Sequence, residues 1–132
     1  MNGVNSPRPT GIVAPHGAKI FEISWDDGKT HRIENEILRG FCPCAGCQGH
    51  SGTIVFQNGK NHELRTIKQV GNYALSLTWG DQHDTGIFSF DYLRRLGELR
   101  AALGLDELKS VENLQRAHIT PAADSSASSD TE

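Results

Sequence analysis

Apolar and polar residues alternate along several stretches of this chain, which is the pattern of half-buried strands. The first such stretch places Phe21, Ile23 and Trp25 on one face, with polar residues between them. An Asp27-Gly28 pair follows, and this dipeptide is a strong signal for a hairpin turn. The alternation predicts strands over residues 18–25, 30–33, 64–69, 73–79 and 85–88.

A helical period of apolar residues follows the last predicted strand. Leu93, Leu96 and Leu99 recur at helical spacing. Ser89 suits the N-cap position, so the sequence predicts a helix over residues 89–103. These elements predict an α+β fold: a small, mostly antiparallel sheet with one main C-terminal helix packed on a face and a Cys-rich zinc knuckle.

The apolar phase of each element also predicts which side chains form the core. One or two helical turns over residues 34–40 add Ile37 to this set. The predicted core consists of Phe21, Ile23, Trp25, Ile37, Leu75, Leu77, Trp79, Ile87, Phe88, Leu93 and Leu96.

Composition divides the chain into three parts. Only 36% of its 132 residues are hydrophobic, and these are concentrated in the middle. Residues 1–16 are rich in Pro, Gly and Asn and predict a flexible arm. Residues 17–104 carry the apolar pattern and predict one folded domain, and residues 105–132 predict a weakly helical segment followed by a disordered acidic tail.

Charge and hydropathy exclude several classes of protein. The formal net charge is −3 and no run is rich in Lys or Arg, so nucleic acid is not expected as a partner. No apolar run reaches the length of about 18 residues that a membrane helix needs. The chain does not begin with a secretory pattern, so we expect a cytoplasmic protein.

The chain has three cysteines, and all lie within one short segment. Cys42, Cys44 and Cys47 form a C-x-C-x-x-C pattern that also contains Pro43 and Gly46. Clustered thiolates repel one another unless a cation shares them, and a tetrahedral zinc site needs only one further ligand. Two alternatives remain: buried thiols that act as small hydrophobes, and redox chemistry at the C-x-x-C pair.

Several histidines are candidates for the fourth ligand. His50 continues the local spacing, whereas His83 lies on a polar turn between two predicted strands and would tie the cysteines to the sheet. The spacing leaves both open. His31 is interpreted as a residue on the surface of a strand.

Several separated motifs resemble one known family. The run Leu38-Arg39-x-x-Cys42-Pro43-Cys44-Ala45-x-Cys47 is followed by Val70-Gly71-Asn72-Tyr73-Ala74-Leu75, by Trp79-Gly80-Asp81-x-His83-x-Thr85-Gly86-Ile87-Phe88 and by Tyr92-Leu93-Arg94. In order and spacing these motifs resemble the gamma-butyrobetaine hydroxylase-like N-terminal domain family, in a stand-alone bacterial form. The resemblance covers roughly residues 17–97.

The resemblance implies a zinc site formed by Cys42, Cys44, Cys47 and His83, with His50 as the alternative fourth ligand. In that family the domain precedes the oxygenase domain of carnitine-pathway hydroxylases, and similar domains are attached to Mrp-type iron-sulfur carrier ATPases. The resemblance therefore implies that this protein is a zinc-binding accessory module that binds a protein partner or a second copy of itself. The alternative is a protein that handles iron or an iron-sulfur cluster, or does thiol-redox work, with such ATPases.

Catalysis by this chain itself is not expected. A 2-oxoglutarate oxygenase needs two histidines and a carboxylate around iron, with open coordination positions, and the sequence lacks the H-x-D motif that begins such a set. A phosphate-binding G-x-x-x-x-G-K-[ST] loop is also missing from the sequence. Four protein ligands would leave zinc no position for a reactive water.

Overall fold

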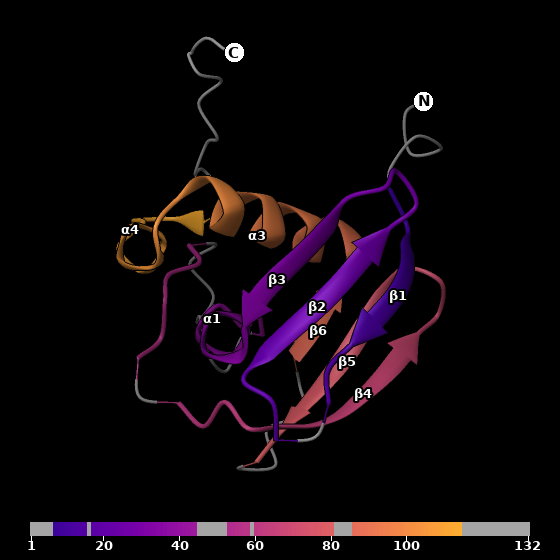
Figure 1. Cartoon of the computed structure of the whole chain (residues 1–132). Helices are drawn as coiled ribbons and strands as arrows, with labels where there is room; N and C mark the ends of the chain where they lie inside the picture. Colours follow the sequence, from indigo (N-terminus) through magenta and orange to yellow (C-terminus); the bar gives the residue numbers. More distant parts are fainter. Residues whose placement is uncertain (1–6, 16, 45–52, 59, 81–85, 115–132) are drawn as a thin grey trace, which may run out of the picture.

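The computed structural model describes residues 7–15, 17–44, 53–58, 60–80 and 86–114. The strands in these ranges form two antiparallel sheets of three strands each, and one sheet lies over the other (Figure 1). The first sheet has the order β1 (Pro9–Val13), β2 (Ile20–Trp25), β3 (Thr30–Glu34). The second has the order β4 (Leu64–Val70), β5 (Ala74–Trp79), β6 (Gly86–Ser89). The helices are α1 (Asn35–Gly40), α3 (Phe90–Ala102) and α4 (Leu105–Lys109).

The α+β class is confirmed, but the prediction of a single sheet is wrong. Each sheet is a meander of neighbouring strands, and the long connection from α1 to β4 separates the two meanders. Alternation fixes which face of a strand is apolar, but it does not say which strands become neighbours. Here the apolar faces of the two sheets meet, so that β2 and β5 contribute to the same core.

Residues 9–13 form a strand, where the sequence predicted a flexible arm. Ile12 of β1 pairs with Ile23 of β2, and the Asp26 N–H donates to the Arg8 carbonyl (2.8 Å). The register shifts between Pro9 and Gly11. A bulge of this kind disturbs the two-residue period, which is why the pattern gave no strand signal there.

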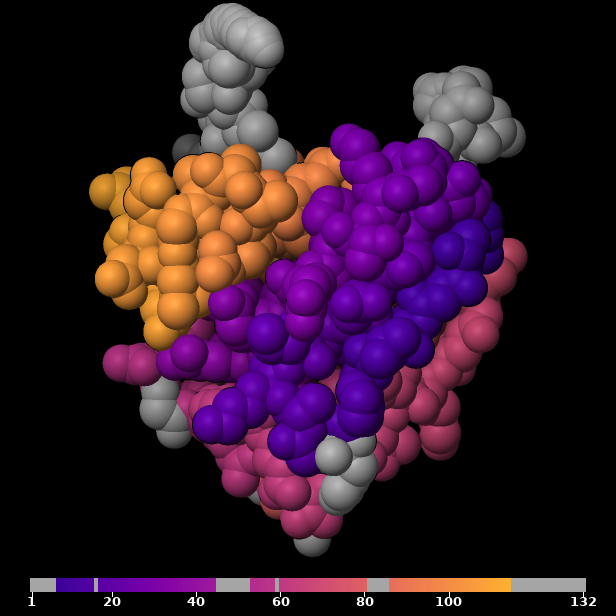
Figure 2. Space-filling view, in the orientation of Figure 1, coloured from indigo at the N-terminus to yellow at the C-terminus, as the bar shows by residue number. Residues whose placement is uncertain are grey.

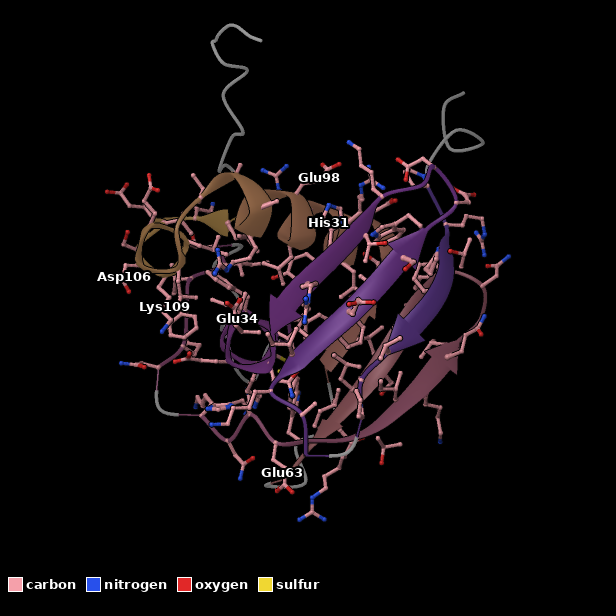
Figure 3. The ribbon with its side chains drawn as sticks, viewed as in Figure 1. His31, Glu34, Glu63, Glu98, Asp106 and Lys109 are labelled. Carbon is pink, nitrogen blue, oxygen red and sulfur yellow. The ribbon has the colours of Figure 1, made fainter. Side chains whose placement is uncertain are left out.

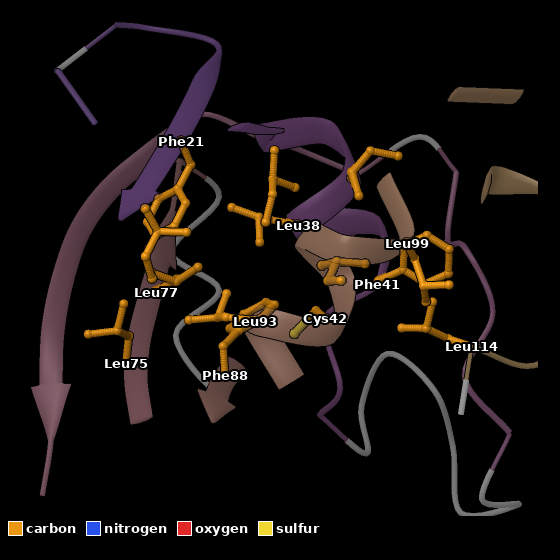
Figure 4. Packing of buried hydrophobic residues seen from close by; sticks show 14 of the residues in the cluster. Phe21, Leu38, Phe41, Cys42, Leu75, Leu77, Phe88, Leu93, Leu99 and Leu114 are labelled. Atoms are coloured by element: carbon orange, nitrogen blue, oxygen red, sulfur yellow. The ribbon is translucent and has the colours of Figure 1, made fainter. Parts of the chain in front are cut away.

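The predicted core is confirmed at every position except Ile87. Its side chain is 47% exposed, because Ile87 pairs with Ser76 on the outer face of the second sheet. Figure 4 shows part of the core, with Phe21, Leu77 and Leu93 packed together. Further buried side chains that the prediction had left out include Ile33, Leu38, Phe41, Cys42, Ala74, Leu99, Leu108 and Leu114.

The main helix begins as the sequence predicted. Ser89 is the N-cap of α3, and its hydroxyl accepts a hydrogen bond from the Tyr92 N–H (3.0 Å). The helix packs against β3 and β6, one strand from each sheet. The segment after it was predicted to lie outside the domain, but Leu108 and Leu114 are fully buried in the core. No helix in the described part of the chain is long and apolar enough to cross a membrane.

Candidate functional site

Cys42 is positioned by the end of α1. The Phe41 N–H donates to the Ile37 carbonyl (3.0 Å) and the Cys42 N–H to the Arg39 carbonyl (3.2 Å), so the helical hydrogen bonding continues up to the first cysteine. Gly40 lies directly against the Phe56 ring, and a side chain at this position would collide with the ring. The first cysteine therefore leaves the helix from a tightly packed turn.

Cys42 is fully buried and lies beside β6. A methyl group added to Gly86 would lie 2.8 Å from Cys42 Sγ, so the sulfur packs directly on the first residue of that strand. Figure 4 shows Cys42 close to Phe88 and Leu93. The fold thus brings the start of the cysteine segment to the strand that follows residues 81–85, the range that contains His83.

Tyr92 of α3 secures the same turn. Its hydroxyl donates a hydrogen bond of 2.6 Å to the Phe41 carbonyl. Burial raises the pKa of the Tyr92 hydroxyl far above its ordinary value, and negative charge on the Cys42 thiol adds to the shift. Tyr92 therefore stays protonated and remains a donor. Sequence reasoning did not detect this bond, because it joins residues far apart in the chain.

The remaining predicted zinc ligands are only partly within the described ranges. Cys44 is half-buried, whereas Cys47, His50 and His83 lie outside the described residues. Among the residues that are described, no group of three or more His, Cys, Asp or Glu side chains is arranged to hold a metal ion. The Cys-rich zinc knuckle is therefore not supported as part of the observed fold, and the ligand set stays a prediction.

His31 is buried, which corrects the prediction that it lies on the surface. The residue is 7% exposed, and its Nδ1 accepts a hydrogen bond from Trp25 Nε1 (3.0 Å). Burial, together with the charge of Arg94, lowers the pKa of His31. The signal was available in the sequence, since His31 and the buried Ile33 occupy the same phase of β3.

Arg94 joins α3 to the turn between β2 and β3. Its guanidinium donates two hydrogen bonds to Asp27 (3.1 and 2.8 Å) and one to Glu98 (2.7 Å). It also lies over the Trp25 ring, at 5.4 Å from the ring centre. The hydrogen bonds from Arg94 are the main cause of the lowered pKa of Asp27. This group of side chains is structural, because it holds the main helix against the first sheet.

Open grooves on the described surface include the following two. One of about 620 Å³ lies between β3 and α3, and Figure 3 shows two of its lining residues, His31 and Glu98, near each other. In the space-filling view the same two elements meet along one face of the molecule (Figure 2). The other groove, of about 450 Å³, is lined by residues 17–19 and 60–64. Neither groove includes a cysteine.

Comparison with known proteins agrees with the motifs. The family model described as "Gamma-butyrobetaine hydroxylase-like, N-terminal" matches residues 12–94, which is more than half of the chain. This chain belongs to that family. The match includes all three cysteines and His83, but it ends before the buried residues Leu108 and Leu114.

Solved structures of similar proteins share the fold. A crystal structure of a protein of unknown function from Acidithiobacillus ferrooxidans, of the DUF971 family, is 37% identical, with a TM-score of 0.56 over 68% of this chain and 92% of that one. Two solution structures determined by NMR are also similar. One is 28% identical, with a TM-score of 0.65 over 98% of this chain and 90% of that one. The other is 32% identical, with a TM-score of 0.61 over 77% and 82%. No curated protein matches the chain.

Proposed function

We propose that this member of the family is a zinc-binding accessory domain that binds a protein partner and catalyses no reaction itself. The zinc is held by Cys42, Cys44, Cys47 and His83, with His50 as the alternative fourth ligand. Membership of the family supports this set, because the family resemblance implies these ligands at these positions.

One contact carries the proposal. Cys42 Sγ packs against Gly86, and Gly86 is the third residue after His83 in the sequence. The first predicted ligand is therefore buried against the first described residue after the range that contains His83, which supports a ligand set that includes both. For His50 the support is the local spacing of the sequence.

The chemistry of the donors fits a structural metal ion. Three thiolates and one neutral imidazole form a usual tetrahedral zinc set. Bound zinc would cross-link the cysteine segment to the second sheet and contribute folding free energy. Cys42 lies in the core and Cys44 is half-buried, so the protein itself shields one side of the ligands from water. A closed, shielded site favours a structural role over hydrolysis.

The metal content of the protein, purified without oxygen and without added metal, tests the proposal. We expect one zinc per chain and a colourless sample. A brown sample with iron and sulfide would support the alternative, in which the cysteines handle an iron-sulfur cluster. Protein free of both metals after reconstitution with each would contradict both functions.

Single substitutions test the ligand set. Cys44 is the best cysteine to replace, because it is half-buried and its change to serine removes less core packing than a change at Cys42. We expect Cys44→Ser and His83→Ala to weaken zinc binding, as measured by competition with a chromophoric chelator. His50→Ala is the matched control and should bind zinc like the wild type. The opposite ranking of the two histidines would assign the fourth ligand to His50.

A turnover assay tests the absence of catalysis. Purified protein is given iron, 2-oxoglutarate and a trimethylammonium substrate, and succinate is measured. We expect no succinate above a control with iron alone. Succinate above that control would contradict an accessory role.

Co-purification tests the protein partner. We expect the wild type to purify with a defined partner protein, and we expect this complex to be lost with Cys44→Ser.

A further inference from the structure

The segment that returns from the cysteines is held by the C-terminal end of the described chain. Residues 53–57 are the first described residues after Cys44, and residues 105–114 lie against them. The Leu114 N–H donates to the Ile54 carbonyl (2.7 Å), and the Ile54 N–H donates to Asn113 Oδ1 (3.1 Å). This pair of opposed bonds fixes the backbone of the returning segment.

Side chains reinforce the two backbone contacts. Ile54 and Leu114 are both buried, with exposures of 7% and 0%. The Lys109 ammonium lies 5.2 Å from the centre of the Phe56 ring and forms an ion pair with Glu36 of α1 (2.9 Å). Figure 3 shows Lys109 on α4 at the side of the molecule where α1 lies.

The returning segment is also held from its other side. The Gln57 N–H donates to the Gly40 carbonyl (2.8 Å), and the Phe56 ring packs edge-on against Phe41 with ring centres 5.5 Å apart. Residues 53–57 therefore lie between the end of α1, which delivers Cys42, and the C-terminal segment. Both ends of the cysteine segment are thus fixed in position relative to each other.

We infer that residues 105–114 form a clamp that positions the cysteine segment for metal binding, an inference that rests on the proposed function. A segment with both ends fixed has fewer conformations to lose when its thiolates converge on one ion. If the clamp opens, the returning end is released and the same ligands must be ordered at a greater entropic cost. Metal affinity then depends on residues outside the predicted ligand set. The clamp lies beyond the part of the chain that the family model matches.

Asn113 is the residue that tests the clamp, because its side chain accepts the Ile54 N–H. Asn113→Ala removes the acceptor, whereas Asn113→Asp keeps an acceptor of the same shape. Asp27→Ala is the control for general destabilisation, since it breaks the Arg94 ion pair at the turn between β2 and β3. Zinc affinity of each full-length variant is measured by competition with a chelator, alongside its thermal unfolding without metal.

We expect Asn113→Ala to lower zinc affinity about tenfold, while Asn113→Asp and Asp27→Ala keep the affinity of the wild type. Equal affinities for Asn113→Ala and Asp27→Ala would overturn the clamp as a positioning device. If the wild type binds no zinc, the proposed function is wrong, and amide hydrogen exchange then tests the clamp separately. Slow exchange of the Ile54 and Leu114 amides that becomes fast in Asn113→Ala would support a clamp on the segment. Fast exchange in the wild type would overturn it.

Discussion

Gly86 and Gly97 are two of several glycines that lie so close to neighbouring side chains that even a methyl group would collide. A Cβ on Gly86 would lie 2.8 Å from Cys42 Sγ, and a Cβ on Gly97 would lie 2.7 Å from Cγ of His31. The first glycine lets the cysteine pack on β6, and the second lets the main helix approach β3. Because these two glycines have no side chain, the neighbouring elements can pack this closely.

Gly86→Ala should destabilise the protein and weaken zinc binding, because the new methyl group displaces Cys42 Sγ. Overpacking of this kind costs about 1–3 kcal/mol, which urea unfolding measures. Gly11→Ala is the matched control, since a Cβ at Gly11 meets no atom within 4 Å. If both alanine variants unfold at the wild-type urea concentration, the contact between Gly86 and Cys42 is not tight.

The lowered pKa of His31 predicts that the folded protein loses stability in mildly acidic solution. Burial, and then the charge of Arg94, lower its pKa below the ordinary value of 6.5, whereas Glu98 and Asp27 oppose the shift and Lys29 adds to it. The unfolded chain therefore binds more protons than the folded chain just below that value. The stability contributed by neutral His31 is present above pH 6.5 and is lost as the pH falls towards the folded-state pKa.

The measurement compares unfolding free energies of wild type and His31→Gln at about pH 7 and about pH 5. Glutamine stays neutral and can still accept the Trp25 Nε1 hydrogen bond, so its stability should change less between the two conditions. Asp27 and Glu34 also have lowered pKa values, below 3.8 and 4.5, because of hydrogen bonds from Arg94 and Arg100, and their contribution is lost at lower pH. Equal pH dependence in both proteins would contradict the role of His31.

At the scale of elements, β5 and β6 show how one pair of strands separates core from surface. Leu77 on β5 is fully buried, whereas Ile87 on β6 is 47% exposed. Leu77 pairs with Gly86 and Ile87 pairs with Ser76, so the two apolar side chains point to opposite faces of the same sheet. Burial follows the face of the strand and not the apolar character of the residue.

Leu77→Ala should therefore cost about 2–5 kcal/mol of unfolding free energy, the range for emptying a buried leucine site. Ile87→Ala removes an apolar side chain of the same size from the neighbouring strand and should cost much less. Chemical denaturation of the two variants gives both values. Similar losses of unfolding free energy for the two variants would show that Ile87, on the outer face of the second sheet, is buried as Leu77 is.

At the scale of the whole molecule, β1 ties the two sheets together. It forms the edge of the first sheet, and Arg8, just before it, donates to the Asn72 carbonyl in the turn of the second sheet (2.9 Å). The Arg8 guanidinium also lies 5.7 Å from the centre of the Phe90 ring, at the start of α3. Residues 8–13 therefore contact both sheets and the main helix.

Deletion of residues 1–13 should lower the melting temperature and promote association, because it removes these contacts and exposes the edge of β2. Deletion of residues 1–6 keeps β1 and serves as the control, and we expect it to melt like the wild type. Thermal unfolding and sedimentation of both proteins check this. If the protein without residues 1–13 melts at the wild-type temperature, the contacts of β1 do not stabilise the fold.

The sequence by itself determined the local features of this protein. Alternation identified five of the six strands in the described ranges, helical spacing and Ser89 identified the main helix, and Asp27-Gly28 identified the hairpin turn. Each of these signals depends on residues close together in the chain. The C-x-C-x-x-C motif and its neighbours also identified the family, which the family model confirms over residues 12–94.

Only the tertiary structure decided which distant residues meet. The division into two facing sheets, the burial of His31 and the exposure of Ile87 depend on which surface covers each face of a strand. The contacts of Cys42 with Gly86, of Tyr92 with Phe41 and of Leu114 with Ile54 join segments between 44 and 60 residues apart. A local pattern carries no information on such pairs, because the free energy that selects them comes from packing the whole core at once.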